Sequence, residues 1–90
     1  MFYAYVLVSL KDGKLYIGQT NLLKRRLSEH WRGDVESTRH RRPLKLIFAE
    51  LFLTRQESER RELWLKSGAG REELKKILSI SLQKVGYRFL

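Results

Sequence analysis

FYAYVLVS (Phe2–Ser9), LKDG (Leu10–Gly13) and KLYIG (Lys14–Gly18) follow one another at the start of the chain. The first and last of these stretches are rich in aromatic and β-branched residues, which favour strands. Asp12-Gly13, between them, is a strong signal for a hairpin turn. We therefore predict that the chain begins with an antiparallel β-hairpin.

The register of this hairpin determines which tyrosines share a face. A turn centred on Asp12-Gly13 places Ser9 opposite Tyr16, so Tyr3, Tyr5 and Tyr16 point the same way. In this register Tyr5 and Tyr16 lie about four residues apart along the sheet, or roughly 13 Å between their backbones. They would then serve different atoms of a substrate, unless a bulge shifts the register.

A helix is predicted after the hairpin. Gly18-Gln19-Thr20-Asn21 is expected to break the second strand, with Asn21 as the N-cap. The helix then runs to about Trp31, and Gly33 ends it. Apolar residues recur at i, i+4 and i+8, and the buried stripe that they predict is Leu23, Leu27 and Trp31.

The middle of the chain predicts a loop, a strand and a second helix. Residues Asp34 to Arg42 form a polar loop without periodicity, closed by Pro43. Leu44 to Thr54 is a nearly continuous apolar run, which favours a central strand covered on both faces. Thr54-Arg55-Gln56-Glu57 is a capping-box sequence. The helix that it starts should run to about Ser67 and stop at Gly68-Ala69-Gly70.

A third helix is expected from Arg71 to about Ser79, which leaves Ile80 to Leu90 as a tail of ambiguous structure in the same domain. Ninety residues suffice for one domain. The element order β-β-α-β-α-α predicts an α+β fold, with a three-stranded, mainly antiparallel sheet flanked by helices.

Composition excludes several functional classes. The chain has no cysteine, which excludes disulfides, thiol catalysis and cysteine-ligated zinc. No apolar run approaches the roughly 20 residues of a membrane span. Met1 to Leu10 has neither a basic n-region nor a small-residue cleavage site, so we expect a strand there and a cytoplasmic protein.

The net charge of +9 indicates a polyanionic partner, which we expect to be nucleic acid and, from the chemistry below, DNA. Positive side chains concentrate between Asn21 and Lys45, and arginines outnumber lysines there. The guanidinium fork matches phosphate oxygens, although small basic proteins also exist without such a partner. The residues expected to bind the nucleic-acid backbone are Lys24, Arg25, Arg39, Arg41 and Arg42.

Tyr5 and Tyr16 are the first candidates for catalysis. Aromatic residues are common in strands for structural reasons alone. A free phenol titrates near pH 10, so a catalytic phenol needs a cation, a metal-bound water or a basic neighbour. The chain offers such neighbours in the following helix.

Arg26 and His30 lie one helical turn apart, next to the expected buried stripe. Arg26 can neutralise charge on a pentavalent phosphate, and His30 can exchange a proton near neutral pH. Each residue alone is more often an ordinary surface residue. Arg25 is the competitor for the role of Arg26, but it lies about 100° round the helix.

Glu62 is the candidate metal ligand. It shares a helical stripe with Ser58 and Leu65, and a carboxylate on such a face needs a partner. The partner is either a metal ion or a cation, Lys66 or Arg61. Glu59 is the alternative carboxylate. A single carboxylate suits Mg²⁺, which retains most of its waters and binds substrate phosphate.

The order and spacing of these residues resemble the GIY-YIG nuclease family, in particular its small stand-alone bacterial members. Tyr16-Ile17-Gly18 is the second half of the family motif, and Tyr5 lies eleven residues before it. Arg26 follows Tyr16 by ten residues and precedes His30 by four. Glu62 resembles the family's metal-binding glutamate. The resemblance extends from about Phe2 to Ile77.

The resemblance implies a GIY-YIG-like nuclease domain over residues 1–79 and single-metal hydrolysis of DNA. Tyr5 would be the general base or the phenol that positions water, with Tyr16 its partner at the phosphate. Arg26 would stabilise the transition state, His30 assist proton transfer and Glu62 bind Mg²⁺, with Mn²⁺ as a possible substitute. The implied enzyme is a weakly specific or structure-selective endonuclease of DNA repair, recombination or degradation.

Three departures from the family pattern leave other interpretations open. The first half-motif reads Tyr3-Ala4-Tyr5, Gln19 stands where several active members have lysine, and no asparagine follows Glu62. One alternative is a catalytically silent nucleic-acid-binding protein that retains the fold. Another is a basic accessory of a larger ribonucleoprotein, with Arg39-His40-Arg41-Arg42 as its docking segment.

Overall fold

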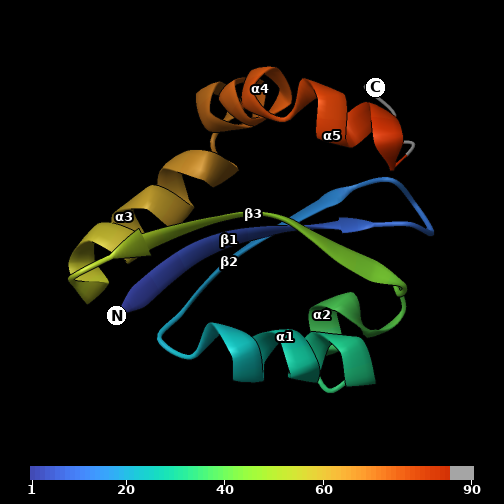
Figure 1. Ribbon diagram of the computed structural model, residues 1–90, viewed down its shortest axis with the longest axis horizontal. Helices are drawn as coiled ribbons and strands as arrows, with labels where there is room; N and C mark the ends of the chain where they lie inside the picture. Colours follow the sequence, from blue (N-terminus) through green and yellow to red (C-terminus); the bar gives the residue numbers. More distant parts are fainter. Residues whose placement is uncertain (86–90) are drawn as a thin grey trace.

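The computed structural model describes residues 1–85 and contains one antiparallel sheet (Figure 1). Its strands are β1 (Phe2–Ser9), β2 (Leu15–Thr20) and β3 (Leu44–Phe52), in the order β2-β1-β3. The α+β class and the three-stranded sheet are therefore confirmed. The expectation that the third strand is central was wrong. The central strand is β1, whose residues Ala4 to Val8 have no exposed surface, whereas β3 has a neighbour on one side only and buries its residues only in part.

The helices lie on both sides of the sheet (Figure 1). Helices α1 (Leu23–Arg32) and α2 (Glu36–Arg39) cover one face. The other side carries α3 (Arg55–Lys66), α4 (Gly68–Ile77) and α5 (Ser79–Lys84).

The hairpin register differs from the prediction by two residues. Tyr5 lies opposite Gly18, and Leu7 lies opposite Tyr16. The predicted sharing of a face by Tyr5 and Tyr16 is confirmed, but the predicted distance between them was wrong. The reason is a longer turn: the amide of Ser9 donates to the carbonyl of Lys14, so four residues form the loop instead of two.

The Ser9 side chain holds this longer loop. Its hydroxyl oxygen accepts hydrogen bonds from the amides of Lys11 and Asp12, at 3.1 and 3.0 Å. Gly13, the last loop residue, has φ 73°, a left-handed conformation that side chains disfavour. The Asp-Gly pair was thus a correct signal for the hairpin, although it does not occupy the centre of the turn.

The boundaries of β2 and α1 also differ from the prediction. Strand β2 continues to Thr20, and the N-cap position of α1 is Leu22, not Asn21. The hydroxyl oxygen of Thr20 accepts a hydrogen bond from the amide of Leu22 at 3.1 Å. A side chain from the end of the strand therefore satisfies an amide at the helix start.

Two short helices lie where none was expected. Helix α2 occupies part of the segment predicted as a loop, and α5 occupies part of the ambiguous tail, of which residues 86–90 lie outside the described structure. The glycine-rich stop after α3 is instead the first turn of α4. Ser67 separates these two helices and caps the second, because its hydroxyl oxygen accepts from the amide of Gly70.

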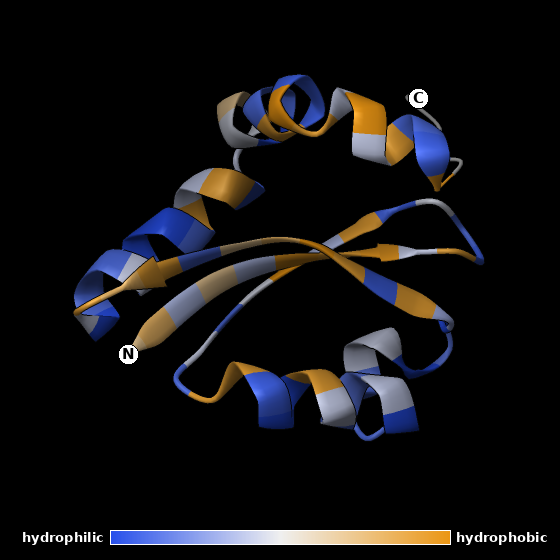
Figure 2. Cartoon of the chain, viewed as in Figure 1, coloured by the Kyte–Doolittle hydropathy of each residue, from blue (hydrophilic) through white to orange (hydrophobic). Residues whose placement is uncertain are grey.

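The apolar core lies between the sheet and the helices α3 to α5, and Figure 2 shows hydrophobic colours along the strands. The predicted N-cap of α3 is confirmed, since Thr54 accepts a hydrogen bond from the amide of Glu57. No helix in the described residues is long and apolar enough to cross a membrane. The buried residues that form the core are Ala4, Val6, Val8, Leu15, Ile17, Leu65, Leu74, Leu78 and Leu82.

The opposite face of the sheet is buried differently from the prediction. His30 has no exposed surface, whereas Trp31, expected in the buried stripe, is 42% exposed. Leu23 and Leu27 are only half-buried. An imidazole therefore takes the most buried position of α1, which is favourable only because both of its nitrogens have partners.

Candidate active site

A buried hydrogen bond joins the central strand to the first helix. The phenol oxygen of Tyr5 lies 2.8 Å from Nε2 of His30, and neither side chain has exposed surface. The two rings meet edge to face, with centroids 5.8 Å apart. The position of Tyr5 in β1, covered by neighbouring strands on both sides, fixes one end of this contact.

Thr38 fixes the other side of the imidazole. Its hydroxyl oxygen lies 2.8 Å from Nδ1 of His30 and makes a longer contact of 3.5 Å with the carbonyl of Val35. A hydroxyl that donates to Val35 must accept from Nδ1–H. The network therefore assigns the lone pair to Nε2, which accepts the proton of the Tyr5 hydroxyl.

Thr38 is a site residue that the sequence did not reveal. It lies in the segment predicted as an aperiodic loop. There it belongs to the short helix α2, and it is the one residue of that helix that is fully buried. Its separation of eight residues from His30 corresponds to no motif that could have been recognised.

Tyr16 provides the phenol that remains half-exposed. It is a diagonal neighbour of Tyr5 across the hairpin, with ring centroids 6.2 Å apart, and its ring lies 5.0 Å from that of His30. Because Tyr5 is fully buried and Tyr16 is only partly so, Tyr16 is the phenol that solvent and a substrate can reach.

Gly18 makes room for the Tyr5 ring. The two residues are direct partners in the hairpin register. A Cβ atom on Gly18 would lie 2.6 Å from both Cζ and the hydroxyl oxygen of Tyr5, which is closer than van der Waals contact allows. The glycine of the second half-motif is therefore required by the ring of the first.

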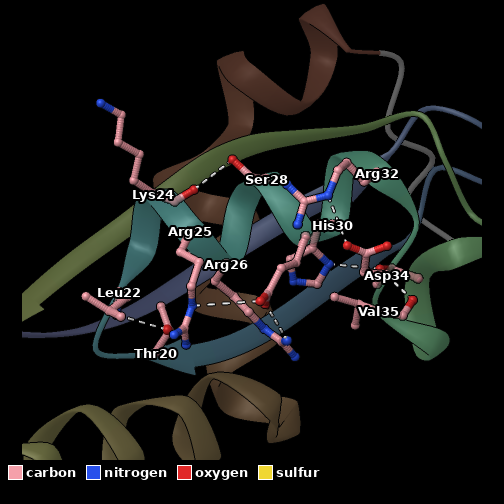
Figure 3. Close-up of polar contacts among 12 residues, drawn as sticks. Thr20, Leu22, Lys24, Arg25, Arg26, Ser28, His30, Arg32, Asp34 and Val35 are labelled. Carbon is pink, nitrogen blue, oxygen red and sulfur yellow. Dashed lines mark hydrogen bonds and ion pairs between the residues drawn. The ribbon is translucent and has the colours of Figure 1, made fainter.

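Arg26 is the cation of the cluster. Its guanidinium, labelled beside Arg25 and His30 in Figure 3, forms an ion pair with Glu29 at 3.1 Å. It also interacts with the phenols of Tyr5 and Tyr16. Arg25 also pairs with Glu29, at 3.7 Å, but its side chain is 61% exposed, compared with 34% for Arg26. The geometry thus favours Arg26 over its competitor.

Burial and charge determine the protonation of the cluster. Burial, followed by the neighbouring Tyr16, raises the pKa of Tyr5 well above its ordinary value. Burial and the positive charge of Arg26 lower the pKa of His30 to about 4. The pKa of Arg26 is raised by Glu29 and the two phenols, which outweigh its own burial. At neutral pH the cluster is therefore a protonated phenol, a neutral imidazole and a guanidinium cation.

Glu62 lies apart from this cluster. It projects from α3, on the other side of the sheet, where its side chain is 21% exposed and pairs with Lys66 at 3.5 Å. Within residues 1–85, no hydrogen bond or ion pair joins it to the tyrosines. Arg61, the other expected partner, pairs instead with Glu50 at 2.7 Å.

One strand connects the cluster with the helix that carries Glu62. Strand β2, which carries Tyr16, is at the edge of the sheet and contacts α3. Gln19 of β2 donates a hydrogen bond of 3.0 Å to the hydroxyl of Ser58, one helical turn before Glu62. The stripe predicted for this helix is confirmed, because Ser58 and Leu65 are fully buried.

No cluster of three or more ligating side chains exists among the described residues. A lone, partly exposed carboxylate such as Glu62 fits an ion that retains its waters, such as Mg²⁺, better than it fits zinc.

The expected nucleic-acid-binding residues fall into two groups. Lys24 and Arg25 are exposed on α1, and Arg39 and Arg42 are exposed near α2. Arg41 differs from them: its guanidinium is half-buried, pairs with Asp12 at 3.0 Å and lies 3.4 Å from the carbonyl of Leu15. Its position ties the segment after α2 to the hairpin loop.

Comparison with known proteins finds a matching family and several relatives. Residues 1–75 match the model of the GIY-YIG catalytic domain. A UPF0213 protein of Clostridium perfringens is 36% identical over 97% of this chain and 94% of its own length. One from Bacillus licheniformis is 45% identical over 71% of this chain and 66% of its own length. One from Streptococcus agalactiae is also 45% identical, over 71% of this chain and 73% of its own length. No solved structure shows a significant match.

Proposed function

This chain belongs to the GIY-YIG nuclease family, and from that membership we propose that it is a Mg²⁺-dependent endonuclease that hydrolyses phosphodiester bonds in DNA. The observation that carries the proposal is the cluster of Tyr5, Tyr16, Arg26 and His30. Residues from two strands and a helix converge there, and the hydrogen bonds and charges of the cluster suit a reaction at phosphorus.

Tyr16 is the phenol that faces the substrate in this proposal. It is half-exposed, whereas Tyr5 is buried, has a raised pKa and donates a hydrogen bond to His30. These properties make Tyr5 a poor general base. Its role in this proposal is to hold His30 and the neighbouring ring of Tyr16 in place. This assignment gives Tyr16 the water-positioning role that the family resemblance alone implied for Tyr5.

The reaction is an in-line attack of water on phosphorus. Tyr16 orients the attacking water, whose proton passes to solvent as the new P–O bond forms. The bond to the 3′ oxygen breaks, that oxygen takes a proton from solvent, and the products are a 3′-hydroxyl and a 5′-phosphate. Arg26 stabilises the charge that develops on the phosphate oxygens. His30, held by Tyr5 and Thr38, keeps the buried side of the cluster in one protonation state.

Glu62 would hold the metal ion. Its carboxylate provides a single hard oxygen ligand, and the neighbouring edge strand carries Tyr16, so phosphate at this edge can approach both residues. When bound, Mg²⁺ supplies positive charge at the phosphate that the protein side chains alone do not. Metal binding would compete with the ion pair between Glu62 and Lys66, because both use the same carboxylate.

We propose that DNA binding depends more on the negative charge of the phosphate backbone than on the base sequence. The exposed cations Lys24, Arg25, Arg39 and Arg42 suit phosphate contacts, which position a nucleic acid without reading its bases. The shape and flexibility of the substrate should then govern selectivity, as in enzymes of DNA repair, recombination or degradation.

The test compares Glu62→Gln with Glu59→Gln, since Glu59 is an exposed carboxylate on the same helix. Labelled single-stranded, duplex and branched DNA are incubated with Mg²⁺ or Mn²⁺. Cleavage should disappear in Glu62→Gln and persist in Glu59→Gln, while both variants retain most DNA binding. Binding without cleavage by the unmodified protein under either metal would show a silent binder, and normal cleavage by Glu62→Gln would exclude Glu62 as the metal ligand.

A further inference from the structure

A basic hollow lies beside the C-terminal end of α1, and none of the buried cluster's residues lines it. It has a volume of about 570 Å³. Its walls come from the hairpin loop, the end of α1, the segment around α2 and the start of β3. The lining residues are Lys11, Trp31, Arg39, His40, Arg42, Pro43 and Leu44.

Trp31 is the aromatic wall of this hollow. It directly follows the buried His30 in the chain, yet it is 42% exposed. An indole has a large apolar face, and leaving much of it in water forgoes stabilisation that burial would give. Because α1 directs His30 toward the sheet, Trp31 is turned toward the hollow instead.

Three cations of the hollow are positioned by main-chain carbonyls. Lys11 Nζ lies 3.0 Å from the carbonyl of His40. Arg39 Nε and Arg42 Nε each lie 3.0 Å from a carbonyl, those of Gly33 and Arg39 respectively. None of the three forms an ion pair with a carboxylate in residues 1–85. Hydrogen bonds to carbonyls therefore orient these three side chains, while no carboxylate of the described residues neutralises their positive charges.

Gly33 contributes to this arrangement. It ends α1 with φ 85°, and a Cβ atom there would lie 2.6 Å from Cζ of Arg42. The Arg42 guanidinium packs over the helix end in the space that the glycine leaves, and its Nη1 lies 3.4 Å from the carbonyl of Trp31. A positive charge is thus held at the end of the helix that carries Trp31, and both side chains line the hollow.

We propose that this hollow binds one unpaired nucleotide of a nucleic-acid strand, with the base stacked on Trp31 and the adjoining phosphate contacted by Arg39, Arg42 and Lys11. Stacking platforms flanked by cations are the usual means of binding single-stranded nucleic acid, because every base has a π face. An acidic peptide would satisfy the cations but would leave the indole without a planar partner. The inference rests on the proposed nuclease function and gives it a substrate class: strands with an unpaired segment next to the cleaved bond.

The chain contains a matched control in its only other tryptophan, Trp64. Trp64 is 40% exposed and lines another hollow that also contains arginines. There, however, the Arg61 guanidinium already lies 4.8 Å from the centre of the indole ring and is neutralised by Glu50. Trp64 thus has an internal partner, and its hollow is lined by the carboxylate Glu57 as well as by arginines, whereas no carboxylate lines the first.

Single-tryptophan variants test the inference by fluorescence. Trp64→Phe leaves Trp31 as the sole reporter, and Trp31→Phe leaves Trp64. Titration with a single-stranded oligothymidylate should quench Trp31 and leave Trp64 unchanged. Trp31→Ala should weaken binding of that oligonucleotide about tenfold, since stacking of one base is worth roughly that much, and Trp64→Ala should change it less than twofold.

The outcomes separate this inference from the proposed enzyme. If Trp31 is not quenched while the protein cleaves DNA, the hollow is not a nucleotide site and the nuclease proposal stands. If Trp31 is quenched but no DNA is cleaved with Mg²⁺ or Mn²⁺, the nucleotide site stands and the nuclease proposal fails. Equal quenching of Trp31 by polyglutamate would overturn the inference in favour of an acidic protein partner.

Discussion

The hydroxyl of Tyr5 and Nε2 of His30 lie 2.8 Å apart, although 25 residues separate them in the chain and neither has exposed surface. This contact joins the central strand to the first helix and restricts the imidazole to one tautomer. Only one side chain of the candidate cluster, Tyr16, is then left both aromatic and accessible. The buried pair therefore supports the accessible phenol of Tyr16.

The stability of the fold should decrease as the pH falls from about 6.5 to about 4. The pKa of His30 is about 4 in the folded protein, below its ordinary value of 6.5, so the unfolded chain binds a proton more readily in this interval. The loss reaches up to about 3 kcal/mol at the lower end. Urea unfolding at several pH values measures it.

The second histidine serves as the control for this pH dependence. His40 is exposed and is the only other histidine, so His40→Gln leaves His30 as the single imidazole to which the pH dependence can be assigned. Direct titration of both imidazoles by NMR should show His30 neutral at pH 6. A His30 pKa near 6.5 would contradict the expectation.

Thr38→Val should destabilise the protein and reduce cleavage, whereas Thr38→Ser should behave like the parent. Valine has nearly the shape of threonine but leaves Nδ1–H of His30 without an acceptor, at a cost of about 1–3 kcal/mol. The ¹⁵N shifts of His30 should report a protonated Nδ1 in the parent and in Thr38→Ser. An unprotonated Nδ1 in the parent protein would show that the assigned tautomer is incorrect.

Arg26 and Arg25 should differ in the kind of defect that their loss causes. Arg26→Ala removes the cation that contacts both phenols and should lower the rate of cleavage by about 10²–10³ at saturating DNA. Arg25→Ala should leave that rate nearly unchanged and reduce the salt dependence of binding by about one phosphate contact. Single-turnover rates and binding measured over a range of salt separate the two effects. Equal loss of rate in both variants would argue against the distinct position of Arg26.

The arginines around α2 should also separate into two classes. The combination of Arg39→Ala and Arg42→Ala should weaken DNA binding and reduce its salt slope by about 2, since both guanidinium groups are exposed and free of carboxylates. Arg41→Ala should lower the thermal midpoint more than the binding affinity, because Arg41 pairs with Asp12 and tethers the hairpin loop. Binding that depends on Arg41 as strongly as on Arg42 would contradict this division.

Local sequence signals predicted the hairpin, the class of the fold and the start of α3. The Asp12-Gly13 turn and the Thr54 cap operate within a few residues, so single-sequence reasoning could identify them. The register failed because the Ser9 hydroxyl holds a four-residue loop by accepting two amide protons. Turn chemistry of this kind depends on a side chain outside the turn itself.

The sequence identified most residues of the candidate site, but it did not predict which of them are buried. The phenols and Arg26 were found from spacing, because β and α periods place them on definite faces. The burial of His30 in preference to Trp31 was missed, since periodicity assumes that the larger apolar residue faces inward. Two partners distant in sequence, Tyr5 and Thr38, reverse that preference.

Gly18 shows what the second half of the motif contributes to the first. Its backbone is ordinary strand, outside the left-handed region, so the missing side chain serves the ring across the hairpin and not the local conformation. The two halves of the motif are therefore complementary in shape: the ring of Tyr5 on one strand fills the space that Gly18 leaves on the other. An alanine at position 4 is compatible with that shape, because Ala4 faces the other side of the sheet, whereas a residue other than glycine at position 18 would require a smaller one at position 5.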